Sequence, residues 1–222
     1  MAVHGRYRTL SAALSVLLSA CAGYQAGNTA LIQAAWGGDS SRVETLLQTG
    51  ADVNASNREG MTALMASTWG VTSMSDARIA RMLIAKGADV NAANIYGRTA
   101  LMEVAKNGNL EFVNLLLGHG ANVNAKPTGG VTALMQAALN GHTAIVGALL
   151  QHDADPNASD VQGHTALIWA AGKGYVEVVK LLLVHRANVD AKDSRGETAL
   201  VWAMNAKKTD VVRLLREAGA RE

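Results

Sequence analysis

The sequence has few of the residues that supply cross-links or bulky aromatic packing. Its 222 residues include one cysteine, Cys21, so no disulfide can form within the chain. Aromatic residues make up only 4% of the chain, whereas apolar residues make up 49%. This combination favours thin layers of small and aliphatic side chains between close-packed helices over one bulky core.

The sequence also lacks an excess of one charge and the common catalytic motifs. It has 20 Lys and Arg residues and 18 Asp and Glu residues, and two of the basic residues, Arg6 and Arg8, lie at the extreme N-terminus. Without these two the chain is formally neutral, so a basic footprint for nucleic acid is absent. There is no glycine-rich phosphate loop, His-Glu-x-x-His pair or Gly-x-Ser-x-Gly elbow. We therefore expect neither enzyme activity nor a cofactor, and an enzyme with an unrecognised site stays open as the alternative.

Residues 1–21 have the pattern of an export signal. Arg6 and Arg8 precede a short apolar run, 10–20, which is about half of the roughly 20 residues that a membrane-spanning helix needs. The run ends in Leu-Ser-Ala-Cys, which resembles the lipobox of bacterial lipoproteins. In that family the peptide is cut before the cysteine, and the cysteine is acylated. The alternative is an ordinary signal peptide in which Cys21 occurs by chance.

The lipobox resemblance implies where the protein resides. It implies a lipid on Cys21, and Ala22 rather than Asp after the cysteine implies the outer membrane of a Gram-negative bacterium, with the rest of the chain facing the periplasm. Residues 22–27 form a short tether that can reach at most about 20 Å. We expect the following domain, residues 28–222, to lie close to the bilayer.

One sequence unit recurs six times through the rest of the chain. The triplet Thr-Ala-Leu starts at positions separated by 33, 37, 33, 33 and 33 residues, namely Thr29, Thr62, Thr99, Thr132, Thr165 and Thr198. Segments related to Gly-Ala-Asp-Val-Asn repeat with the same spacing. A fixed period near 33 predicts stacked units that cannot bury their apolar faces alone. We therefore predict an all-α solenoid of six repeats, the second with a four-residue insertion and the last acting as a cap.

Each unit predicts two helices followed by a hairpin. The threonine is a natural N-cap of the first helix, and Gly108, Gly141 and Gly174 stand where a left-handed residue would end it. A second helix carries apolar residues at helical spacing. The asparagines of the closing segments are suited to bonding neighbouring loop backbone: Asn54, Asn91, Asn124 and Asn157.

This pattern is similar to the ankyrin repeat, over roughly residue 26 to the C-terminus. The family's Thr-Pro-Leu-His is altered here, because alanine replaces the proline and Ile, Met or Val replaces the histidine. We expect apolar contacts in place of the family's His-to-Thr hydrogen bonds, at Ile32, Met65, Met102, Met135, Ile168 and Val201. In the last repeat, charged residues predict an outer face that meets water: Lys207, Lys208, Arg213 and Arg216.

Three histidines at 33-residue spacing, His119, His152 and His185, raise the question of a metal site. Equivalent helices in neighbouring repeats lie about 8–10 Å apart, whereas zinc ligands bind at about 2.1 Å. The three residues therefore cannot share one ion. We expect each to close a second helix, where its ring complements the helix dipole.

The ankyrin resemblance implies a concave face, made of the hairpin tips and the exposed side of the first helices, that binds another protein. The residues that map to this face are Met61, Ile95, Tyr96, Arg98, Val131, Val161, His164, Trp169 and Trp202. A row of aromatic and aliphatic groups is what a protein-binding patch needs, although scattered exposed apolar residues are also ordinary. The insertion between Trp69 and Asp76 is either part of that face or a tolerated surface insertion.

These features predict a lipid-anchored periplasmic protein that binds another protein and is monomeric when unbound. By resemblance to bacterial ankyrin lipoproteins, we expect an immunity protein that neutralises a secreted effector. The alternatives are an accessory partner of a periplasmic enzyme such as a catalase, and a purely structural envelope protein.

Overall fold

The computed structural model describes residues 29–69 and 77–221. Within these residues lie 12 helices in six pairs and no strands. The first helices of the pairs are α2 (Ala30–Trp36), α4 (Ala63–Ala66), α6 (Ala100–Asn107), α8 (Ala133–Leu139), α10 (Ala166–Lys173) and α12 (Ala199–Asn205). The second helices are α3 (Ser40–Gln48), α5 (Ala77–Ala85), α7 (Leu110–Gly118), α9 (Thr143–Gln151), α11 (Val176–Val184) and α13 (Thr209–Glu217).

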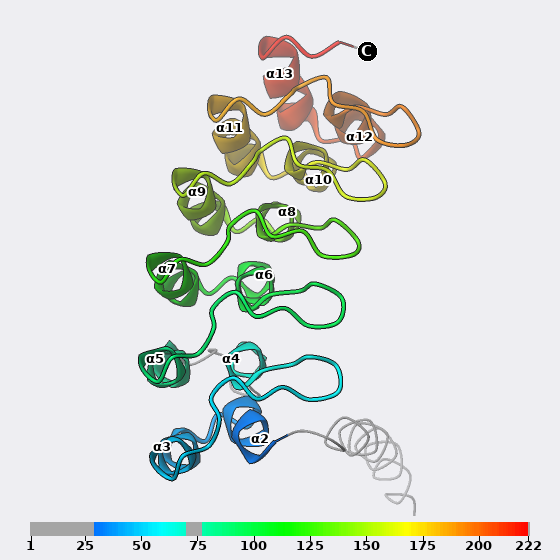
Figure 1. Cartoon of the computed structure of the whole chain (residues 1–222). Coiled ribbons are helices and arrows are strands. Elements are labelled where there is room, and N and C mark those ends of the chain that lie inside the picture. The colour runs from blue at the N-terminus through cyan, green and yellow to red at the C-terminus, as the bar shows by residue number, and fades with distance from the viewer. Residues whose placement is uncertain (1–28, 70–76, 222) are drawn as a thin grey trace, which may run out of the picture.

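The helix pairs stack in one row, which bends towards a set of hairpins that all project from the same side (Figure 1). The first helices lie between the hairpins and the second helices. This arrangement confirms the predicted all-α solenoid of six repeats. Its concave face is the side that carries the hairpins.

The threonine of each repeat caps the first helix, with one exception. In five repeats its hydroxyl oxygen accepts a hydrogen bond of 3.2–3.4 Å from the backbone N–H three residues later. Thr99 makes no such bond, and its Oγ1 is buried without a hydrogen-bond partner. The predicted N-caps are therefore confirmed at every repeat except the third.

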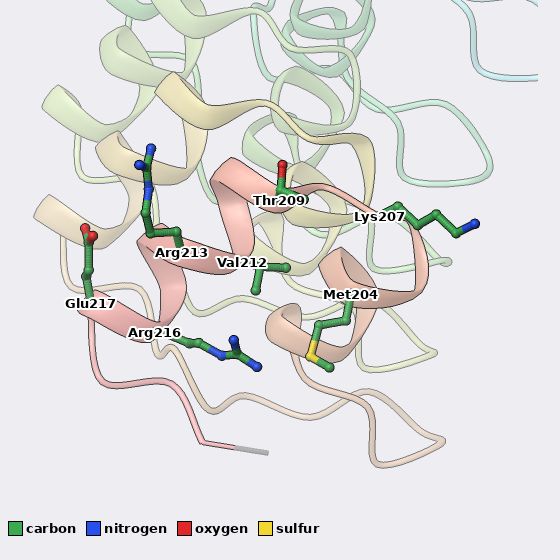
Figure 2. A pocket seen from close by; sticks show the side chains of 7 residues that line it. All are labelled: Met204, Lys207, Thr209, Val212, Arg213, Arg216 and Glu217. Atoms are coloured by element: carbon green, nitrogen blue, oxygen red, sulfur yellow. The ribbon is translucent and has the colours of Figure 1, made fainter.

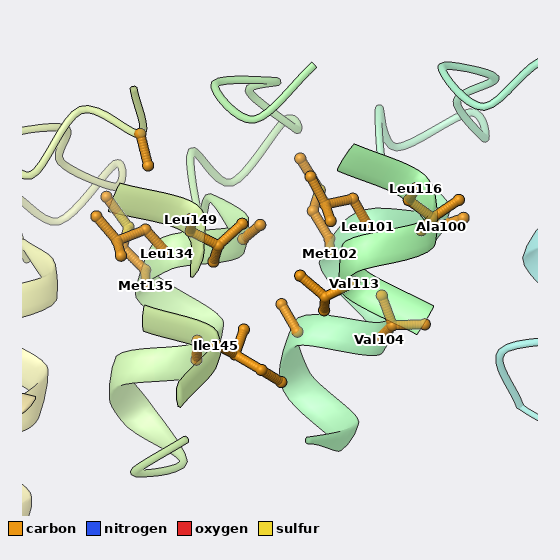
Figure 3. Packing of buried hydrophobic residues seen from close by; sticks show 14 of the residues in the cluster. Ala100, Leu101, Met102, Val104, Val113, Leu116, Leu134, Met135, Ile145 and Leu149 are labelled. Carbon is orange, nitrogen blue, oxygen red and sulfur yellow. The ribbon is translucent and has the colours of Figure 1, made fainter. Parts of the chain in front are cut away.

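The core is a series of thin apolar layers, each shared by two neighbouring repeats. Figure 3 shows side chains of α6 and α7 lying beside those of α8 and α9. The residues expected to replace the histidine hydrogen bonds are 0–2% exposed in the first five repeats: Ile32, Met65, Met102, Met135 and Ile168. Val201 is only half-buried, because no repeat of the described residues packs beyond the sixth. Burying one such side chain contributes about 1.5–3 kcal/mol.

Glycine is favoured between the paired helices of the third, fourth and fifth repeats for two reasons. Gly108 and Gly174 end α6 and α10 with φ of 88° and 86°, and Gly141 follows α8 with φ of 74°. A Cβ on Gly108 would lie 2.6 Å from the ring of His142, and a Cβ on Gly141 would lie 2.9 Å from the ring of Tyr175. The left-handed backbone favours glycine, as the sequence predicted, and the close ring leaves no room for a Cβ. In the last repeat, where no such ring follows among the described residues, Lys207 takes the equivalent position with φ of 56°.

Asparagines of the loops after the second helices join each repeat to the next. Asn54 donates its side-chain N–H to the carbonyl of Gly87 (3.1 Å) and accepts from the N–H of Asp89 (2.8 Å). The same pair of bonds is made by Asn91, Asn124 and Asn157. The predicted role of these asparagines is confirmed.

The histidines at 33-residue spacing directly follow α7, α9 and α11. Nδ1 of His119 and of His152 lies 2.9 Å from a carbonyl oxygen of its own helix. All three therefore close their second helices as expected. No group of three or more His, Cys, Asp or Glu residues in the described ranges could hold a metal ion.

Some sequence predictions fall outside the described residues. These are the lipobox with Cys21, the tether 22–27 and the additional residues after Trp69. Trp69 itself is described and its side chain is 39% exposed. None of the helices in the two described ranges has the length and apolarity needed to cross a bilayer.

Candidate functional site

One polar side chain organises most of the hairpins. In the first hairpin, Oδ1 of Asn57 accepts hydrogen bonds of 2.9 Å from the N–H groups of Glu59 and Met61. Equivalent pairs of bonds are accepted by Asn94, Asp160 and Asp193. The third hairpin has Pro127 at this position. The hairpins are thus rigid platforms with defined tips.

Neighbouring hairpins are also joined to one another. The N–H of Ile95 donates to the carbonyl of Glu59 at 3.0 Å, and the N–H of Val161 donates to the carbonyl of Gly129 at 3.2 Å. Two further bonds of this kind link the remaining junctions, from Thr128 to Tyr96 and from Ser194 to Gln162. The tips therefore form one continuous edge of the solenoid.

Three residues predicted for the concave face are well exposed at these tips. Val161 is 75% exposed, Ile95 is 62% exposed and Tyr96 is 56% exposed. The tip between them carries the exposed Thr128 and Gly129. The apolar tips therefore form two patches, one at the second hairpin and one at the fourth. The polar tip of the third hairpin separates them.

Two other residues that the sequence analysis placed on the concave surface are buried, so that expectation was wrong for them. Met61 is 2% exposed and His164 is 6% exposed, and Val131, which holds the equivalent place, is half-buried. The chain turns inwards just before each first helix, so these side chains lie beneath the next hairpin: the Asn94 amide lies 3.9 Å from Sδ of Met61. They support the concave face rather than forming its surface.

Arg98 has a structural partner. Its Nε lies 2.6 Å from Oε1 of Glu103, whose side chain is only 7% exposed. A buried carboxylate needs such a partner, because an unpaired charge in the interior is strongly destabilising. The Arg98 guanidinium therefore compensates the negative charge of the Glu103 carboxylate in α6.

The structure brings three of the predicted residues together in the fifth and sixth repeats. The ring centroids of Trp169 and Trp202 lie 5.6 Å apart at an interplanar angle of 74°. The ring of His164 lies 4.6 Å from that of Trp169 and 5.1 Å from that of Trp202. These are favourable edge-to-face and tilted contacts, and we call the three residues the aromatic cluster.

A buried carboxylate supports the aromatic cluster from behind. Oδ2 of Asp193 accepts a hydrogen bond of 3.0 Å from Nε1 of Trp202, and the guanidinium of Arg195 lies 3.4 Å away. Burial raises the pKa of Asp193, but N–H donors of Glu197, Trp202 and Arg195 and the charge of Arg195 outweigh it, so the pKa is lowered. The carboxylate is therefore held in its charged form.

His164 lies between two carboxylates. Its Nδ1 lies 3.1 Å from Oδ2 of Asp160, and its Nε2 lies 3.9 Å from Oδ2 of Asp193. All three side chains are at most 7% exposed. Because a substrate could not reach this ring, the arrangement braces two neighbouring hairpins and does not offer a site for acid–base chemistry.

Sequence reasoning missed the part that Asp160 and Asp193 play. Neither residue was singled out from the sequence. A signal was present, because positions 57, 94, 127, 160 and 193 follow the repeat spacing and hold Asn, Asn, Pro, Asp and Asp. Because these positions are equivalent in successive repeats, the recurrence of Asn or Asp at four of them points to the residue that organises those hairpins.

Two hollows lie at the C-terminal end of the solenoid. The first, which we call the tryptophan pocket, has a volume of about 430 Å³ and lies between α10, α12 and the last hairpin, which belong to the elements that make the concave face. It is lined by Trp169, Gly172, Lys173, Arg195, Glu197, Trp202, Asn205 and Ala206. Both predicted tryptophans thus contribute to one concave, accessible site.

The second hollow, the end groove, lies between α12 and α13 on the outer face of the last repeat and has a volume of about 760 Å³ (Figure 2). Met204 and Val212 supply its apolar part. Three of the four charged residues expected for a capping repeat line it, namely Lys207, Arg213 and Arg216, together with Glu217. This is the face on which a further repeat would otherwise pack.

A family model for ankyrin repeats in three copies matches residues 4–94, 70–160 and 157–221, which together span most of the chain. No curated protein matches the sequence significantly.

Proposed function

Because the chain belongs to the ankyrin-repeat family, whose members are typically protein-binding scaffolds, we propose that it binds another protein through its concave face. The observation that carries this proposal is the juxtaposition of exposed apolar hairpin tips with the tryptophan pocket on one side of the solenoid. Exposed apolar groups beside a concave aromatic site are typical of protein-interaction surfaces.

The rigidity of the face also supports binding. The hairpins are fixed by side-chain hydrogen bonds at their bases and by backbone bonds between neighbours. A surface that is already ordered loses little conformational entropy when a partner binds. The Asp160–His164–Asp193 arrangement contributes to this order and is closed to a substrate.

Two equally exposed valines provide a matched test of the proposal. Val161 is 75% exposed on a concave hairpin tip, and Val184 is 77% exposed at the end of α11, on the other side of the stack. We expect Val161→Arg to reduce recovery of a stoichiometric partner from solubilised envelopes by about tenfold or more, and Val184→Arg to leave it unchanged. Equal thermal midpoints would show that both variants are folded. Full recovery of the same partner with Val161→Arg would contradict binding through this face.

We further propose that the protein is anchored to the outer membrane by a lipid on Cys21 and faces the periplasm. The support is the export-signal pattern, the lipobox and Ala22 after the cysteine. Metabolic labelling with an alkyne fatty acid should mark the native protein but not Cys21→Ala, and the native protein should sediment with outer-membrane fractions. Equal labelling of both forms would refute the anchor.

The finer role that we propose is immunity against a secreted effector. A neutral binding scaffold held at the envelope suits interception of an enzyme that attacks the envelope. Cells lacking the protein should then be killed by effector-secreting neighbours, and the native protein should restore survival where Val161→Arg does not. If the deletion instead lowers the activity of a periplasmic enzyme without such killing, the accessory role is correct.

A further inference from the structure

We propose that the tryptophan pocket is the specificity site of the concave face and takes a large apolar side chain of the partner protein next to an acidic residue. The inference rests on the proposed function, and it assigns the pocket's own chemistry.

A glycine in the fifth repeat lets a tryptophan of the next repeat pack directly against the first helix. A Cβ on Gly172 would lie 2.8 Å from Cε3 of Trp202, so any side chain there would intrude on the tryptophan wall. The earlier first helices carry large residues at the same place: Trp36, Trp69, Lys106 and Leu139. Glycine disfavours a helix relative to alanine, so its presence within α10 is explained by the room that it gives the Trp202 ring, which lines the pocket.

The walls of the pocket suit a large apolar side chain. Its volume of about 430 Å³ falls in the range of about 300–1,000 Å³ that is usual for ligand sites. Trp169 and Trp202 pack edge to face, and the hydrogen bond to Asp193 fixes the orientation of Trp202. An aromatic wall that is already ordered is the kind of site that anchors an interface.

The charges at the rim argue against a cationic ligand. The guanidinium of Arg195 lies 5.3 Å from the ring centroid of Trp202 and so already occupies that face. Arg195 also pairs with Glu197 at 2.7 Å and with Asp193 at 3.4 Å, so the nearby carboxylates are neutralised from within. A cationic ligand in the pocket would therefore be repelled by the Arg195 guanidinium.

Lys173 is the cation available to an acidic partner. It lies on the pocket rim, its side chain is exposed, and no carboxylate of the described residues lies within 4.0 Å of it. An acidic residue beside the inserted side chain would pair with this ammonium. The pocket thus combines an apolar anchor site with an adjacent site for an anion.

The charge distribution along the chain favours the same partner. Residues 165–221 contain ten basic and six acidic residues, whereas residues 29–164 contain eight basic and eleven acidic ones. The two repeats that form the pocket therefore carry a net charge of +4, whereas the first four repeats together carry a net charge of −3. An acidic segment would be attracted to this end of the concave face, and salt would weaken the attraction.

A random peptide library displayed on phage tests the proposal with the full-length purified protein. Selected peptides should share a Trp, Phe, Leu or Met next to Asp or Glu. One selected peptide, fluorescently labelled, should bind Lys173→Glu about threefold to tenfold more weakly than the native protein. The same peptide with its acid changed to Lys should show the opposite preference. Lys86→Glu, an equal change of charge at the far end of the solenoid, should leave binding unchanged.

Two further variants separate this inference from the proposed function. Gly172→Leu fills the pocket and should abolish peptide binding; because it strains the helix pair, the surface change Lys173→Glu serves as the independent test. If both variants keep the native partner while Val161→Arg loses it, the concave face binds without this pocket and the inference is wrong. Selected peptides without acidic residues, or Lys173-dependent binding to vesicles containing phosphatidylglycerol instead of peptides, would also overturn it.

Discussion

The indole Nε1 of Trp202 donates a hydrogen bond of 3.0 Å to Oδ2 of Asp193, whereas the indole Nε1 of Trp169, one repeat earlier, is buried without a hydrogen-bond partner. Two tryptophans at equivalent positions therefore differ in one interaction. Trp202 ties the pocket wall to the last hairpin, and Trp169 contributes only its ring. This difference allows the hydrogen bond to be separated from the aromatic contact.

Replacing each tryptophan by phenylalanine measures that hydrogen bond. Trp202→Phe leaves a buried carboxylate with one donor fewer, so it should lower the free energy of unfolding by about 1.5–3 kcal/mol more than Trp169→Phe does. Both changes remove the same volume, so Trp169→Phe is the control. Urea denaturation gives both values. Equal losses for the two variants would show that the bond to Asp193 contributes nothing.

The lowered pKa of Asp193 predicts how stability changes in acid. Burial raises this pKa, but the N–H donors and the charge of Arg195 bring it below its ordinary value of 3.8. The unfolded chain therefore binds the proton more readily, and the stabilisation is present above pH 3.8 and is lost as the pH falls through the folded-state pKa.

Asp193→Asn removes this titration with little change of shape. Asn57 and Asn94 already accept both backbone hydrogen bonds at equivalent positions, so the hairpin should survive. We expect the native protein to be more stable than the variant near neutral pH, and this advantage to shrink below about pH 4. Urea denaturation at several pH values measures it. An advantage that stays constant down to about pH 3 would contradict the lowered pKa.

The asparagines between repeats should couple neighbouring units. Asn124 donates to the carbonyl of Asp153 at 2.9 Å and accepts from the N–H of Asp155 at 2.8 Å. Asn124→Ala should therefore lower the free energy of unfolding by about 1–2 kcal/mol. Asn114→Ala, an exposed change on α7 at a residue that makes none of these bonds, should have almost no effect. The coupling is disproved if the two variants melt at the same temperature.

The third repeat should respond differently when its threonine is changed. Oγ1 of Thr165 accepts the N–H of Ile168 at 3.3 Å, whereas Oγ1 of Thr99 is buried without a partner. Valine has nearly the same shape, so Thr165→Val should cost about 1 kcal/mol of stability. Thr99→Val should be neutral or stabilising, since it removes an unsatisfied polar atom. A loss at Thr99 as large as that at Thr165 would contradict this.

The repeat spacing was enough to predict the solenoid because each layer buries the same kinds of residue at the same places. The threonine caps, the glycines between helices and the asparagine bonds are all local consequences of one repeated unit. Thr99 departs from its copies although its sequence context is the same Thr-Ala-Leu, and nothing in the structure explains the lost cap.

The candidate site was harder to predict because it depends on contacts between repeats. The periodicity places Met61 and His164 near the hairpins, but whether they point outwards is decided by the next hairpin, which covers them. The pocket lies where Gly172 contacts Trp202 of the following repeat. The sequence of a single repeat cannot predict such a contact between two repeats. Exposed tips such as Val161 were predicted correctly, because a hairpin tip has no neighbour to cover it.

Photo-crosslinking in living cells is the most direct test of the central claim that the concave face holds another protein. A photoreactive residue would be placed at Val161 in one strain and at Val184, which is equally exposed, in another. The account predicts a single discrete crosslinked protein from position 161 and none from position 184. The same crosslinked band from both positions, or from position 184 alone, would contradict it.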